Sequence, residues 1–175
     1  MSIDVRIKKL AKGLPAKQAA EAFVLSHEDP ASLSPAELSR ADEFEATVEA
    51  MFLMAAVDGD LSEEELAQLA ASVDAYTSIA GSSRQVDATP ILAKMGEHLA
   101  RDGWNKRLAV VAERLTDSES RAFAFRLAAG VAFVDDHVAH SEAAALEALA
   151  SALAIGAEAS QEILYDVHEA LFAAG

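Results

Sequence analysis

Apolar residues recur every three or four positions along most of the chain, which is the spacing typical of amphipathic helices. The stripe is clearest between Ser34 and Val57, where it comprises Ala41, Phe44, Val48, Met51, Phe52 and Ala55. Valine and isoleucine are sparse and no segment alternates strictly between polar and apolar residues, so no sheet is expected. The pattern predicts an all-α fold, with a single domain of about seven or eight helices.

Start and stop signals divide this pattern into helices. Ser34–Glu37 combines a capping serine, a proline at the first helical position and a glutamate three residues after the cap. Ser62–Glu65 and Thr116–Glu119 predict two further capping boxes, and Gly156 predicts a left-handed helix stop. We expect a basic segment and a first helix over residues 1–33.

The helical domain expected over residues 34–175 contains an internal repeat. Shifting the sequence by 77 residues superposes residues 48–73 on residues 125–150. The matched pairs include Asp58 with Asp135, Leu61 with Val138, Glu65 with Glu142 and Leu69 with Leu146. Each copy consists of an apolar helix, an acidic turn and a second amphipathic helix. Two such hairpins can face each other about a pseudo-two-fold axis and bury both apolar stripes in one core.

Each acidic turn places an aspartate at the C-terminal end of a helix, where a negative charge is unfavourable by ~0.3–1 kcal/mol. One explanation is structural, because Asp58 can bond a backbone N–H group two residues on and Gly59 can adopt a positive φ. The other explanation is a divalent cation, such as calcium, manganese or zinc. Its ligands in the first copy would be Asp58, Asp60 and Glu65.

In the second copy the corresponding ligands would be Asp135, Asp136 and Glu142. His137 and His140 lie close to them in the sequence and favour a transition metal there. The EF-hand pattern fails at the first turn, because Met54 and Ala56 would occupy two of its ligand positions.

The segments VDGDLSEEEL and VDDHVAHSE resemble the TerB-like, tellurite-resistance-associated helical domain. The resemblance spans residues 34–173 and implies an all-α fold with an internal duplication. It also implies tolerance of tellurite and other stress, and cation-dependent association at the inner face of the membrane. The metal ligands it implies are Asp58, Asp60, Glu65, Asp135 and Glu142. The family has no established catalytic reaction, so we expect no enzymatic activity. Asp136 stands where glycine is usual and His140 replaces an acidic residue, so two equal ion sites are not expected.

The net charge of −15 disfavours nucleic acid and anionic lipid as partners and favours cations and basic proteins. Residues 1–18 are basic, which fits either a frayed helix or a segment that docks on an acidic partner. The apolar run Met51–Val57 is too short to span a bilayer, and no secretory signal is evident. We therefore expect a cytoplasmic protein that binds a protein partner. A membrane-associated complex is one form that this partner could take. Homo-oligomerisation is left open.

Two other functions remain open. A protein-interaction module would use the turns only for structure. A metalloenzyme would use Asp135, His137 and His140. The chain has no cysteine, which excludes thiolate chemistry, and it carries no Gly-rich phosphate loop or nucleophile-elbow motif.

Overall fold

The computed structural model describes residues 3–11, 14–59, 61–78, 87–134, 137–138 and 140–173. These residues form nine α-helices, which confirms the all-helical class and exceeds the expected number of helices. The helices are α1 (Ile3–Leu10), α2 (Leu14–Glu28), α3 (Pro35–Ala55), α4 (Glu63–Ser78), α5 (Thr89–Asp102), α6 (Trp104–Arg114), α7 (Ser118–Ala132), α8 (His140–Ala152) and α9 (Ala157–Phe172). A 3-10 turn, η1, covers Pro30–Ser32.

Two short strands, β1 (Phe133–Val134) and β2 (His137–Val138), pair antiparallel between α7 and α8. Phe133 pairs with Val138 and Val134 with His137. The sequence pattern did not predict this pairing, because a two-residue strand is too short to display an alternation. Aromatic and β-branched side chains nevertheless favour an extended backbone on both sides of the bend.

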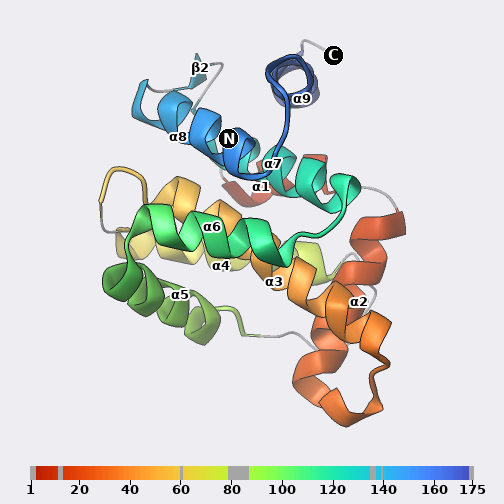
Figure 1. The fold of residues 1–175 in the computed structure, drawn as a ribbon. Helices are drawn as coiled ribbons and strands as arrows, with labels where there is room; N and C mark the ends of the chain where they lie inside the picture. The colour runs from red at the N-terminus through yellow and green to blue at the C-terminus, as the bar shows by residue number, and fades with distance from the viewer. Residues whose placement is uncertain are drawn as a thin grey trace.

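Helix α3 lies at the centre of the molecule and packs against α2, α6 and α7 (Figure 1). Helix α1 packs against α4 and α7, and α9 packs against α7 and α1. In Figure 1, α8 and α9 lie at the opposite end of the molecule from α5. The largest fully buried side chains include Phe23, Phe44, Met51, Leu53, Leu69 and Phe125. None of the described helices has the length and apolarity needed to cross a bilayer.

The described part of the basic N-terminal segment forms α1 and the first turn of α2, and α1 belongs to the core. Its Ile7 and Leu10 side chains are buried, whereas Lys9 is exposed. A Cβ atom on Gly130 of α7 would collide with the Leu10 side chain. Glycine at this position therefore allows α1 to approach α7 closely.

All three predicted helix starts are confirmed, but the predicted capping residue is wrong at one of them. Ser34 Oγ accepts a hydrogen bond from Glu37 N at 3.2 Å, and Ser34 N donates to Glu37 Oε1 at 3.1 Å. Ser62 Oγ accepts from Glu65 N at 3.1 Å. At α7, however, the capping residue is Asp117, which accepts from Ser120 N at 2.8 Å, and not Thr116. A carboxylate one residue closer to the helix satisfies the free N–H groups instead.

The predicted left-handed stop at Gly156 is also wrong. Gly156 has a φ of −65° and precedes α9, whereas Ala154 takes the left-handed conformation with a φ of 56°. Ile155 N donates to Ala150 O at 2.8 Å, and Ala154 N donates to Ser151 O at 3.1 Å. These two bonds form a Schellman motif at the end of α8, and its left-handed residue lies two positions before the glycine.

A buried ion pair joins α3 to α6. Arg107 Nη2 lies 2.6 Å from Glu49 Oε1, and Arg107 Nε donates to Glu49 Oε2 at 3.0 Å. Asp102 accepts a further bond from Arg107 Nη1 at 3.2 Å. Hydrogen bonds from Arg101, and after them the one from Arg107, hold the pKa of Asp102 far below its usual range. Close by, Trp104 Nε1 donates to Leu53 O at 2.8 Å. These contacts fix the α5–α6 corner against the second half of α3.

Candidate functional site

The first acidic bend lies between the end of α3 at Ala55 and the start of α4 at Glu63. Gly59 has a φ of 128°, as its sequence context predicts, and donates to Ala56 O at 3.1 Å. The side chains of Asp58 and Glu65 are both exposed. Asp60 lies outside the described residues. The described part of this bend therefore presents carboxylates to solvent just beyond the negative end of a helix.

The second bend follows α7 and contains β1 and β2. Asp135 and Asp136 lie outside the described residues, as does the side chain of His137. His140 is exposed at the start of α8, and Glu142 is half-buried in its first turn. Among the residues that the structure describes, no three histidine, aspartate or glutamate side chains form a group that could hold a metal ion. Three of the seven predicted ligands lie outside those residues, and so does the side chain of a fourth, so cation binding stays a prediction.

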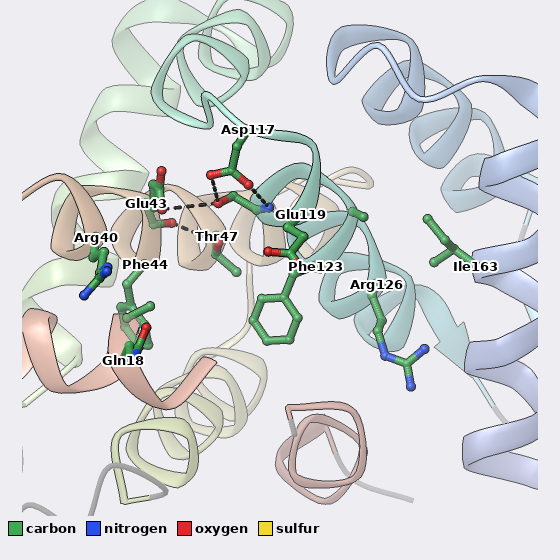
Figure 2. Close-up of a pocket in the computed structure, with 13 residues that line it drawn as sticks. Gln18, Arg40, Glu43, Phe44, Thr47, Asp117, Glu119, Phe123, Arg126 and Ile163 are labelled. Atoms are coloured by element: carbon green, nitrogen blue, oxygen red, sulfur yellow. Dashed lines mark hydrogen bonds between the residues drawn. The ribbon is translucent and has the colours of Figure 1, made fainter. Parts of the chain in front are cut away.

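A second candidate site, which the sequence analysis did not predict, is a cavity of about 510 Å³ bounded by α2, α3, α7 and α9 (Figure 2). Its lining includes Phe44, Phe123 and Ile163 together with Glu43, Asp117 and Ser120. The volume falls in the range of ~300–1,000 Å³ typical of small-molecule sites.

Hydroxyl groups and carboxylates meet at one end of this cavity. Ser120 Oγ lies within donating distance of Asp117 Oδ2 at 2.8 Å and of Glu43 Oε2 at 3.2 Å. Thr116 Oγ1 lies 3.5 Å from Glu43 Oε1, and Thr47 Oγ1 donates to the Glu43 backbone carbonyl at 2.9 Å. The two carboxylates are therefore close neighbours that share one hydroxyl group.

The pKa values of these two carboxylates shift in opposite directions. Burial raises the pKa of Glu43, and the nearby charge of Asp117 raises it further. The hydrogen bonds from the Ser120 N–H and hydroxyl groups lower the pKa of Asp117. Asp117 thus stays ionised as a helix cap, while Glu43 takes up a proton more readily than an exposed glutamate does.

The sequence held no local signal for this cavity. Glu43 and Ser120 lie 77 residues apart and meet only because α3 packs against α7. Asp117 and Ser120 follow a helix-start pattern, which capping alone explains. The only available clue was Glu43 itself, a charged residue adjacent to the buried Phe44 of the apolar stripe.

Comparison of the chain with protein-family models, with characterised proteins and with solved structures gives no match. The TerB-like resemblance therefore continues to rest on the sequences of the two acidic bends.

Proposed function

We propose that this chain is a non-enzymatic, TerB-like stress-response module whose acidic bends bind a divalent cation. The positions of the helix ends support this proposal. Helix α3 ends at Ala55 and α4 begins at Glu63, while α7 ends at Ala132 and α8 begins at His140. Both boundaries differ by 77 residues, which is the offset of the sequence repeat. This agreement supports the proposal that the two bends are equivalent parts of two helical hairpins.

The observation that carries the proposal is the contact between Glu43 of α3 and Ser120 of α7. These residues are also 77 residues apart, and Ser120 Oγ lies 3.2 Å from Glu43 Oε2. Both residues lie five positions before a repeat segment, so extending the repeat to them would make them equivalent, and equivalent residues touch each other where a two-fold axis passes between them. This contact therefore supports a duplicated hairpin packed about such an axis, with the two acidic bends related by it.

The chemistry of the first bend suits a hard cation. Asp58 and Glu65 offer oxygen donors, which calcium and manganese accept, and both side chains are open to solvent. A cation would neutralise Asp58 at the negative end of α3, where the helix dipole opposes a carboxylate. The second bend adds His137 and His140, which would favour a transition metal such as zinc.

The protein's part in this function is to hold negative side chains at two bends between helices. An ion bound there would stiffen the connection between the helices of each hairpin and reduce the local negative charge. Both changes would alter how the bends dock on a protein partner. The link to tellurite and stress tolerance comes from the sequence resemblance.

Calorimetric titration with Ca²⁺, Mn²⁺ and Zn²⁺ tests this function. We expect binding of at least one ion, which Asp58→Asn and Asp135→Asn together abolish. Asp166→Asn is the matched control, because Asp166 is exposed on α9, away from both bends in the chain, and its replacement should leave binding unchanged.

The same titration distinguishes the alternatives. The absence of binding for all three ions would contradict the proposal and favour a protein-interaction module with structural turns. Zinc-selective binding that requires His137 would favour the metalloenzyme instead.

A further inference from the structure

The cavity between α2, α3, α7 and α9 is chemically asymmetric (Figure 2). Glu43 and Asp117 lie together at one end, and the Phe123 ring lies beside them. Arg126 lies beyond Phe123, on the far side from the two carboxylates. Glu119 lines the cavity between Asp117 and the Phe123 ring, and Arg40 lies beside Glu43. The cavity thus offers three carboxylates and one guanidinium group towards one end, an aromatic ring beside them and a second guanidinium group at the other end.

Glu43 is the carboxylate with spare capacity to accept hydrogen bonds. Ser120 has one hydroxyl hydrogen, and its shorter contact, 2.8 Å, is with Asp117. Asp117 also accepts the Ser120 N–H group at 2.8 Å. The hydroxyl contacts of Glu43 are longer, at 3.2 Å to Ser120 and 3.5 Å to Thr116. A donor entering the cavity could therefore form a shorter hydrogen bond to Glu43 than either of these hydroxyl groups does.

We propose that this cavity binds a small organic monocation, a protonated amine carried on an apolar body. The ammonium group would donate to Glu43 and lie near the charge of Asp117, forming charge-assisted hydrogen bonds. The apolar body would lie against Phe44 and Phe123, and an ammonium group beside aromatic rings gains further from cation–π attraction.

Charge at the two ends sets the preferred ligand. Arg40 lies one turn before Glu43 and lowers the negative potential there, but the carboxylates of Glu43, Asp117 and Glu119 outnumber this one guanidinium group. Arg126 at the far end would repel a second positive charge. The cavity is therefore expected to prefer a monoamine to a diamine of the same length. This site is separate from the acidic bends, so its test is independent of the cation proposal.

Titration with 2-phenylethylamine at neutral pH tests the proposal, with 2-phenylethanol as the uncharged analogue. We expect the amine to bind and the alcohol to bind far more weakly. Glu43→Gln keeps the size of the side chain and removes its charge. It should weaken amine binding about tenfold or more, the loss expected from one charge-assisted hydrogen bond. Glu113→Gln, at an exposed position on α6, is the matched control and should bind the amine as the unmodified chain does.

Amide chemical shifts of the unmodified protein give a readout that needs no variant. On addition of 2-phenylethylamine, the amides of Ser120 and Phe123 should shift together with the same apparent dissociation constant. Pentylamine should bind more tightly than 1,5-diaminopentane. Equal affinity for the amine and the alcohol would overturn the proposal. So would unchanged binding by Glu43→Gln, or shifts confined to residues 58–65.

Discussion

At the scale of single residues, Ala154 occupies a backbone conformation that alanine rarely adopts. Its φ of 56° is required by the Schellman motif that ends α8. A left-handed conformation costs an L-residue with a Cβ atom ~1–2 kcal/mol, whereas glycine adopts it without steric cost.

Ala154→Gly should therefore stabilise the protein by about 0.5–1 kcal/mol, after allowance for the greater freedom of glycine in the unfolded chain. Ala144→Gly is the control, because Ala144 is exposed within α8 and should lose about 0.5–1 kcal/mol through its helix propensity. Urea denaturation measures both variants. If both substitutions destabilise the protein to the same degree, the left-handed assignment at residue 154 is incorrect.

Residue patterns predicted the local chemistry of several helix ends. Ser34 and Glu37 form the expected reciprocal cap, and Gly59 has the expected positive φ. The prediction of a left-handed stop at Gly156 was wrong, although glycine is the residue that most often takes this conformation at a helix end. Helix α8 ends at Ala152, and Ala154 supplies the left-handed residue instead. Alanine is not a residue that favours this conformation, so the local sequence pattern did not predict the stop.

At the scale of elements, the ion pair between Glu49 and Arg107 is a buried polar connection between α3 and α6. Its side chains are 2% and 8% exposed, so neither charge is fully solvated. Arg114 approaches the same carboxylate, with Nη1 3.7 Å from Glu49 Oε1. Removing one member of such a pair leaves an uncompensated buried charge.

Arg107→Leu should destabilise the protein by about 3 kcal/mol, near the lower limit for a broken buried pair because Arg114 still faces Glu49. The double variant Glu49→Leu with Arg107→Leu should recover a large part of that loss, since no lone charge remains. Denaturant unfolding of the single and double variants gives the free energies of unfolding for a double-mutant cycle. Additive losses would contradict a direct coupling between the two side chains.

Sequence periodicity predicted most of the helices but not how they are paired. The apolar stripe of α3 indicated its buried face correctly, as the burial of Phe44, Met51 and Phe52 confirms. Glu49 lies within that stretch, and its charge alone would suggest a side chain exposed to solvent. Its partner Arg107 is 58 residues away, and the cavity likewise joins residues that are distant in sequence. Local sequence patterns predict individual helices. A site formed by several helices can be found only once the packing of those helices is known.

At the scale of the whole molecule, the net charge of −15 opposes the compact state through self-repulsion. Several carboxylates are offset by specific pairs, as at Asp102 and Asp42. The first turn of α4 instead holds three exposed glutamates in succession. Salt should screen this excess of negative charge.

Raising NaCl from about 20 mM to about 200 mM should raise Tm by about 2–4 °C, the effect of ~1 kcal/mol at this chain length. Differential scanning calorimetry measures the change. MgCl₂ at the same ionic strength controls for specific binding, because a larger rise with magnesium would indicate occupied sites as well as screening. A Tm that falls or stays constant with NaCl would show that ion pairs already offset the repulsion.

Trp104 is the single tryptophan of the chain, and its indole donates to the carbonyl of Leu53 in the last turn of α3. The helix it touches leads directly into the first acidic bend. Indole emission depends on the hydrogen bonding and polarity around the ring, so the chain carries a native fluorophore beside that bend. Any ligand or partner that shifts the end of α3 should change its emission, which allows titrations without a label.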